Sequence, residues 1–329
     1  MNIKITLLFA MSFILLMAVI TFLLYKRIGK WSINEHSSEE ENEPSDLDEK
    51  KFGENEIGDL VHSFKSMETA LTKQMHNVAQ ITADRERISA ELNIAANIQV
   101  GMLPKDFLEN DKFTIYAQMT PAKEVGGDFY DYFMIDDDHL GLVMADVSGK
   151  GVPAAMFMVI AKTLIKIRTT APGTPKDILY DVNNTLCENN NAGLFVTVWF
   201  GILTLSTREL ISANAGHEYP AIKRNGEDFI LDIDDHCPPL AAMEEMEFEN
   251  TVVKLEPGDE LFLYTDGVPE AKNAQGDRFE TDRMIEVLNK YKELEPEDAL
   301  KNIKQEIDDF VGDCDPFDDV TMLMIKLND

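Results

Sequence analysis

Short apolar runs separated by Gly, Asp and Asn fill the chain after Pro104, and such runs predict β-strands. They lie at 113–119, 129–135, 139–147, 194–205, 208–214, 219–224, 248–254, 260–265 and 319–327. Apolar residues at helical spacing interrupt them at 152–170, 175–190, 280–292 and 296–311. Runs of strands with helices grouped between them predict an α+β fold built in layers rather than a regular βαβ repeat.

A different periodicity precedes this region. One unbroken 4-3 spacing carries Leu60, Phe64, Met67, Leu71, Val78, Ile81, Ile88, Leu92, Ala95 and Met102, with Gln74, Arg85 and Gln99 at the remaining positions. This pattern predicts a helical coiled-coil stalk over 57–103. Polar residues in such a seam fix register and partner number, so we expect a parallel homodimer. The alternative is a single amphipathic helix packed on the following domain.

The N-terminal segment predicts a membrane anchor over residues 1–30. Residues 5–25 carry no charge and would extend about 31 Å as a helix at ~1.5 Å per residue, which matches the bilayer core. Lys26, Arg27 and Lys30 follow the run, whereas Lys4 alone precedes it. The positive-inside rule therefore predicts a single-pass protein of the cell membrane with the rest of the chain in the cytoplasm. A cleaved signal peptide is the alternative, but no small-x-small cleavage site follows the run.

Between anchor and stalk, residues 31–56 form an acidic segment without hydrophobic period, typical of a solvated linker. The stretch Gly53–Met67, GENEIGDLVHSFKSM, resembles the second half of a HAMP signalling module. The linker occupies the place of the first HAMP helix, so the module is degenerate. The expected organisation is an anchor at 1–30, a linker at 31–56, a coiled-coil and HAMP-like helix at 57–103, and a folded domain at 104–329.

Charge and cysteine content exclude several classes of function. The chain has 30 Lys and Arg against 60 Asp and Glu, a formal net charge of −30. Nucleic-acid sites need clustered cations, so no nucleic-acid partner is expected and the partner is expected to be a protein. Cys187, Cys237 and Cys314 form no CxxC pair, which argues against a zinc cluster and a disulfide framework.

Four acidic motifs carry the candidate chemistry. They are Gly126-Gly127-Asp128, Asp146-Val147-Ser148-Gly149, Thr265-Asp266-Gly267 and Asp318-Asp319-Val320-Thr321. In each, an Asp begins or ends an apolar run, so a strand would hold the backbone and leave the carboxylate at its rim. A single Asp-Gly is usually a turn. Four carboxylates that converge without clustered bases would repel one another unless cations neutralise them.

Oxygen-only ligands favour hard cations, so the expected cofactors are two Mn²⁺ or Mg²⁺ ions. Two ions about 3.5–4 Å apart can share a carboxylate and lower the pKa of a bridging water for attack on a phosphoryl group.

Five segments in order resemble the motifs of the SpoIIE/RsbU-type branch of the PPM protein phosphatases. They are AKEVGGDFYDY, ADVSGKGVPAAMFM, NAGHEYP, LYTDGVPEA and PFDDVTMLMI, and the resemblance extends over about residues 88–327. It implies an αββα sandwich, two packed antiparallel sheets flanked by helices, with a dinuclear metal site at one edge. The catalytic residues implied are Asp128, Asp146, Asp266 and Asp318.

The same resemblance implies the metal ligands. Asp146 would bridge two ions, the Val147 carbonyl would bind one, and Asp266 and Asp318 would complete the other. Asp128 would be a direct or water-mediated ligand, and Asp319 is the alternative to Asp318. His217 is a candidate proton donor to the leaving group or, alternatively, a residue that stabilises its turn; Lys123 is a candidate for orienting a substrate phosphate.

The activity implied is hydrolysis of phosphoserine or phosphothreonine by metal hydroxide, without a covalent intermediate. The substrate implied is a phosphorylated signalling protein such as an anti-sigma-factor antagonist. The alternatives are a hydrolase of small phosphoesters and a membrane-anchored docking protein with an inactive phosphatase fold. The intact acids at all four motifs argue against the docking protein.

Overall fold

The computed structural model describes residues 54–104, 111–188, 190–233 and 237–328. These divide into two compact units with the boundary after Gln74. Within the described residues, no helical segment combines the length and the hydropathy that a membrane span requires. The predicted anchor at 1–30 and the linker, apart from its last three residues, lie outside the described residues, so both stay predictions.

Helix α2 runs without interruption from Glu54 to Met102 and confirms the helix predicted over 57–103. Its periodic apolar side chains are exposed along most of its length, at Phe64, Met67, Leu71, Val78, Ile81 and Ile88. Near its C-terminal end the helix packs on the domain, since Gln99 and the following Leu103 are buried. The pairing of two such helices into a coiled coil stays a prediction.

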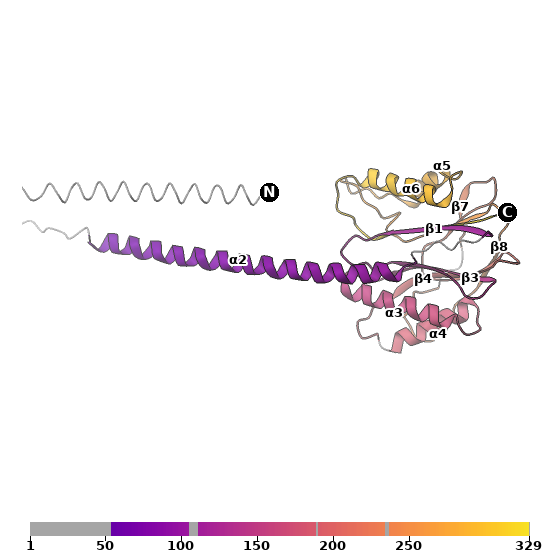
Figure 1. The fold of residues 1–329 in the computed structure, drawn as a ribbon, viewed down its shortest axis with the longest axis horizontal. Coiled ribbons are helices and arrows are strands. Elements are labelled where there is room, and N and C mark those ends of the chain that lie inside the picture. Colours follow the sequence, from indigo (N-terminus) through magenta and orange to yellow (C-terminus); the bar gives the residue numbers. More distant parts are fainter. Residues whose placement is uncertain (1–53, 105–110, 189, 234–236, 329) are drawn as a thin grey trace, which may run out of the picture. The chain divides into compact units, whose positions relative to one another are not determined.

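Two five-stranded antiparallel sheets form the body of the domain (Figure 1). Sheet I has the order β1-β10-β9-β6-β7, with β1 Phe113–Thr120, β10 Val320–Leu327, β9 Glu260–Tyr264, β6 Ala221–Lys223 and β7 Phe229–Leu231. Sheet II has the order β2-β3-β4-β5-β8, with β2 Phe129–Met134, β3 His139–Val147, β4 Val196–Thr204, β5 Glu209–Ala215 and β8 Thr251–Lys254.

Two helices cover each sheet on its outer face, which confirms the αββα sandwich (Figure 1). Helices α5, Thr281–Lys290, and α6, Pro296–Val311, pack on sheet I. Helices α3, Val152–Arg168, and α4, Pro175–Glu188, pack on sheet II. Pro153 and Pro296 lie in first turns, where a missing N–H costs no helical hydrogen bond.

The hydrophobic core fixes the strand ends that matter for function. One buried cluster joins the two sheets and the helices on sheet II, and a second joins sheet I with α5 and α6. Strand β9 is buried at all five positions. Close packing of this kind resists small displacements, so residues at the strand ends keep their relative positions.

Strand β7 is the one described element that the sequence pattern does not predict. Its apolar run, Phe229 to Leu231, is three residues long between polar neighbours, which is too short for a periodicity argument. Its pairing partner β6 supplies the hydrogen bonds that define it.

Candidate active site

The strand register brings the predicted acids from both sheets to one edge of the sandwich. In sheet II, Phe129 pairs with Ala145, so Asp128 and Asp146 are neighbours. In sheet I, Tyr264 pairs with Met322, so Asp266 lies close to the start of β10 at Asp318 and Asp319. We call Asp128, Asp146, Asp266, Asp318 and Asp319 the acid edge.

Asp128 lies deepest in the acid edge and is 2% exposed. Its Oδ2 accepts hydrogen bonds from Thr265 Oγ1 at 2.7 Å and from Thr321 Oγ1 at 2.6 Å. Burial, with the charges of Asp146 and Asp319, holds the pKa of Asp128 well above its usual range. The two threonines belong to motifs of sheet I, so Asp128 of sheet II is tied directly to the opposite sheet.

Asp146 and Asp266 repel other members of the acid edge. Burial raises the pKa of Asp146 to about 7, with a further contribution from the charge of Asp266. Burial also raises the pKa of Asp266 to about 6, assisted by the charges of Asp318 and Glu270 and opposed by Lys150. Such mutual elevation shows that these carboxylates share one poorly solvated region.

Asp319 uses both carboxylate oxygens to hold the loop before β2. Its Oδ1 accepts from the Ala122 amide at 2.8 Å, and its Oδ2 accepts from the Gly127 amide at 2.9 Å. Gly126 makes this approach possible, since a Cβ there would lie 2.2 Å from Asp319 Oδ2. The side chain of Asp319 therefore organises the backbone that presents Asp128.

Asp318 makes different contacts from its neighbour. Its Oδ2 lies 2.8 Å from Lys150 Nζ, and that ammonium also donates to the Phe317 carbonyl at 2.6 Å. Lys150 stands between Gly149 and Gly151, whose φ angles are +87° and +82°. These left-handed positions let the chain bend sharply before α3, with Lys150 directed back at the acid edge.

Val147 contributes a backbone carbonyl close to Asp146 at the end of β3. The side chain of Val147 is buried. A Cβ on Gly127 would lie 2.8 Å from the Val147 carbonyl oxygen and 3.5 Å from Asp146 Oδ1. The Gly-Gly pair thus lets the loop before Asp128 approach this carbonyl closely.

The donors of the acid edge suit hard divalent cations. No three Asp, Glu, His or Cys side chains of the described part of the chain already surround one point as metal ligands. In this arrangement Asp318 pairs with Lys150 and Asp319 accepts from two backbone amides. The donors are all oxygens, and bound cations would offset the burial and the mutual repulsion that raise the pKa values of Asp128, Asp146 and Asp266.

Several residues of the site were not predicted from sequence. Thr265 and Thr321 hydrogen-bond Asp128, and the available signal was a Thr within two residues of an Asp in each of two motifs. Gln99 of α2 donates to the Gly126 carbonyl at 2.7 Å and accepts from the Gly126 amide at 3.2 Å. The available signal for Gln99 was a polar residue at a seam position of the helix, which Gln74 and Arg85 share.

The two basic candidates differ in their positions. His217 is buried, with Nδ1 2.9 Å from Thr197 Oγ1 and Nε2 3.0 Å from the Tyr264 carbonyl oxygen. Both ring nitrogens are thus engaged inside the protein, which argues against proton donation by His217 to a leaving group. Lys123 is exposed on the loop that Asp319 holds.

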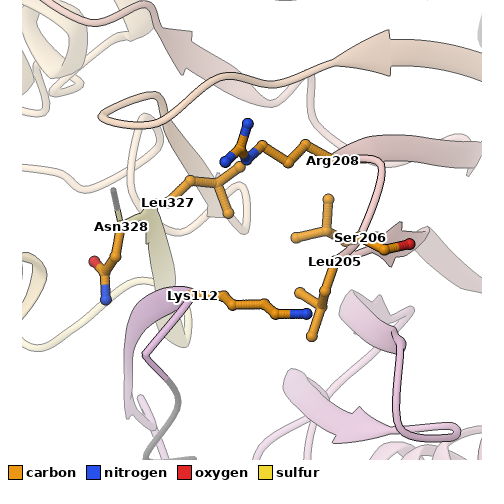
Figure 2. Close-up of a pocket in the computed structure, with 7 residues that line it drawn as sticks. Lys112, Leu205, Ser206, Arg208, Leu327 and Asn328 are labelled. Atoms are coloured by element: carbon orange, nitrogen blue, oxygen red, sulfur yellow. The ribbon is translucent and has the colours of Figure 1, made fainter.

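A pocket of about 240 Å³ lies at the far end of the sandwich. Leu203, Leu205 and Leu327 contribute to its lining, and Figure 2 shows Lys112 extending along it towards Leu205. In the β3–β4 register His139 pairs with Thr204, whereas Asp146 pairs with Thr197. The pocket is therefore separated from the acid edge by the length of these strands.

A known protein family matches more than half of the chain. The model of the family described as Stage II sporulation protein E (SpoIIE) matches residues 136–328. The chain belongs to the SpoIIE family. The described sandwich is accordingly a phosphatase domain of this family.

Two relatives of known name align with this chain over more residues than the family model does. Protein IcfG of Synechocystis sp. (strain ATCC 27184 / PCC 6803 / Kazusa) is 30% identical over 304 residues, which cover 84% of this chain and 47% of IcfG. Phosphoserine phosphatase RsbU of Bacillus subtilis (strain 168) is 26% identical over 242 residues, which cover 74% of this chain and 71% of RsbU. The chain thus spans about half the length of IcfG.

Solved structures share the fold of this SpoIIE-family domain. The SiaA-PP2C domain of Pseudomonas aeruginosa superposes with a TM-score of 0.66 at 22% identity, covering 74% of this chain and 98% of that chain. RsbX in complex with magnesium superposes with a TM-score of 0.52 at 15% identity, covering 68% and 99%. At these identities the likeness shows the fold alone.

Proposed function

We propose that the chain is a metal-dependent protein phosphatase that hydrolyses phosphoserine or phosphothreonine on a signalling protein. The observation that carries the proposal is the meeting of four acidic motifs, two from each sheet, at one edge of the sandwich. Burial and mutual repulsion raise the pKa values of Asp128, Asp146 and Asp266, and bound divalent cations would offset this cost of holding the carboxylates ionised. The name of RsbU, a phosphoserine phosphatase, supports the substrate class.

The contacts favour particular ligands within the acid edge. Asp146 neighbours Asp128 in sheet II and senses the charges of Asp266, Asp318 and Asp319 of sheet I, so it is the candidate for bridging two ions, with the Val147 carbonyl beside it. Asp266 and Asp318 complete the set of metal ligands, because both carboxylate oxygens of Asp319 already accept hydrogen bonds from backbone amides. Two bound Mn²⁺ or Mg²⁺ ions would supply an activated water for in-line attack and neutralise charge on the phosphoryl group.

The chain's own residues have distinct tasks in this proposal. Thr265 and Thr321 hold Asp128 in place, and Asp319 holds the loop that carries it. Lys150 is the nearest described ammonium to Asp318, at 2.8 Å. An ammonium at this position can orient a substrate phosphate as a point charge.

The wider organisation forms part of the same proposal. The substrate is a phosphorylated protein such as an anti-sigma-factor antagonist. The 57–103 helix pairs with a second copy through its exposed periodic side chains. The N-terminal segment holds the protein in the cell membrane with the phosphatase domain in the cytoplasm, as the charge asymmetry around residues 5–25 predicts.

The test is phosphate release from a phosphoserine peptide by the full chain, with Mn²⁺ or with a chelator. Release should require metal and fall by at least about 100-fold in Asp146→Ala, the loss typical of removing a residue essential for transition-state stabilisation. Asp137→Ala, at an exposed position outside the acid edge, is the matched control and should retain activity. Lys150→Ala should raise KM more than it lowers kcat.

Metal-independent release, or full activity in the Asp146 variant, would refute the proposal. A folded protein that binds the phosphopeptide without hydrolysing it would instead support a docking protein. Hydrolysis of p-nitrophenyl phosphate combined with inert phosphopeptides would indicate a small-phosphoester hydrolase.

A further inference from the structure

His217 lies on the segment that crosses from one sheet to the other. Strand β5 of sheet II ends at Ala215, and β6 of sheet I begins at Ala221. Asn214 fixes the backbone of His217, since its Oδ1 accepts from the His217 amide at 2.8 Å and its Nδ2 donates to the His217 carbonyl at 3.2 Å. The imidazole is therefore held on sheet II and is 3% exposed.

The two ring nitrogens contact different sheets. Nε2 lies 3.0 Å from the carbonyl oxygen of Tyr264, the last residue of β9 in sheet I. A carbonyl oxygen only accepts, so Nε2 carries a hydrogen. Nδ1 lies 2.9 Å from Thr197 Oγ1 on β4 of sheet II. In the neutral ring Nδ1 then accepts the hydroxyl hydrogen of Thr197.

Both contacts lead to the acid edge. Thr197 pairs with Asp146 in the β3–β4 register, and its hydroxyl lies 3.4 Å from the Asp146 carbonyl oxygen. Tyr264 precedes Asp266 by two residues. Asp146 of sheet II and Asp266 of sheet I must reach the same pair of cations. The spacing of the two sheets at this point therefore sets the distances between ligands.

We infer that His217 is a positioning residue that sets the spacing of the two sheets at the acid edge through its Nε2–H bond to the Tyr264 carbonyl. By fixing that spacing it raises the affinity of the acid edge for divalent cations. The inference rests on the metal site proposed above and deepens it. Substituting a residue that orients metal ligands without binding the metal itself typically lowers metal affinity 10–100-fold.

Two substitutions separate the cross-sheet bond from the bond within sheet II. The side-chain oxygen of His217→Asn reaches about as far as Nδ1, so it can accept from Thr197 but cannot reach Tyr264. The amide nitrogen of His217→Gln reaches about as far as Nε2, so it can donate to Tyr264. We expect a loss of Mn²⁺ affinity of at least about 10-fold for the Asn variant and less than about threefold for the Gln variant.

The measurement is calorimetric titration of the full-length chain with Mn²⁺ alone, at a temperature where circular dichroism shows each variant to be folded. Weak binding by the Asn variant with near-native binding by the Gln variant supports the inference. Wild-type affinity in the Asn variant, or equal losses in both, overturns it. Failure of the wild-type chain to bind Mn²⁺ would instead overturn the metal site itself, a distinguishable result.

A second pair covers the case in which the Asn variant does not fold. Thr197→Val and His217→Gln each remove the bond between Thr197 and the ring while leaving a donor for the Tyr264 carbonyl. Each should retain Mn²⁺ affinity within about threefold. A 10-fold loss of Mn²⁺ affinity in either folded variant would contradict the inference that the hydrogen bond from Nε2 to the Tyr264 carbonyl sets the spacing of the sheets.

Discussion

At the scale of single residues, the neighbours Asp318 and Asp319 have the same side chain but different surroundings. Asp318 faces Lys150 at the rim, whereas Asp319 is buried and accepts hydrogen bonds from the Ala122 and Gly127 amides. Asp318 thus already holds a cationic side chain that a metal ion could replace, whereas Asp319 maintains the loop that carries Asp128.

This difference predicts different losses on substitution. Asp318→Asn should weaken Mn²⁺ binding by at least about 10-fold, because a ligand charge is lost, while changing the unfolding free energy in chelator by less than about 1 kcal/mol. Asp319→Ala should lower that free energy by about 2–4 kcal/mol, because buried amides lose a charged acceptor. Urea unfolding in chelator and Mn²⁺ titration measure the two effects. The reverse pattern would make Asp319 the ligand.

The acids could be predicted from sequence because each stands at the end of an apolar run within a recognisable motif. The choice between Asp318 and Asp319 could not, since the turn before β10 determines which carboxylate faces outward. The position of Lys150 was equally hidden, because it depends on the left-handed glycines on both sides.

At the scale of elements, the end of α2 meets the loop that presents Asp128. The Gln99 side chain donates to the Gly126 carbonyl and accepts from the Gly126 amide, so the end of α2 is bonded directly to the loop. The same Gly126 allows the approach of Asp319. The end of α2, the loop before β2 and the segment just before β10 therefore meet at Gly126.

Removing the Gln99 contact should impair the acid edge. Gln99→Ala leaves both backbone groups of Gly126 unpaired in a buried place, so we expect a destabilisation of about 1–3 kcal/mol. We also expect lower Mn²⁺-dependent phosphate release by the protein that remains folded. Asn97→Ala, on an exposed face of the same helix, is the control and should behave as wild type. Equal activity of the two variants would show that this contact does not act on the site.

Periodicity was sufficient to predict the elements that bury a continuous apolar face, which is why every predicted strand and helix of the sandwich except β8 lies within two residues of its expected range at both ends. It failed at β7, where three residues carry too little pattern. It also could not decide what covers the exposed seam of α2, because burial by a second chain leaves the same pattern as burial within one chain.

At the scale of the whole molecule, the acid edge makes folding depend on pH. The pKa of Asp146 is raised to about 7 and that of Asp266 to about 6, from an ordinary value of 3.8. The folded state therefore binds more protons than the unfolded state between about pH 4 and pH 7. This contribution to stability is fully present below the unfolded pKa and is lost as pH rises through the folded value.

In chelator, the unfolding free energy should therefore fall by about 2 kcal/mol between about pH 5.5 and pH 8 from Asp146 alone. The surface carboxylates with lowered pKa, Asp136, Asp138 and Asp177, are ionised throughout this window and do not oppose the trend. Calorimetry of the wild-type chain and of Asp146→Asn measures the difference. An equally steep fall in the variant would assign the pH dependence to other groups.

The central claim is that the two sheets together form one dinuclear metal site, and the number of Mn²⁺ ions bound by the full chain tests it most directly. Calorimetric titration near pH 7.5, where Asp146 is largely ionised, should give two ions per chain. Asp146→Ala should abolish tight binding of both ions, whereas Asp137→Ala should leave both in place. A folded wild-type chain that binds no Mn²⁺, or that binds two ions unchanged after loss of Asp146, would contradict the account.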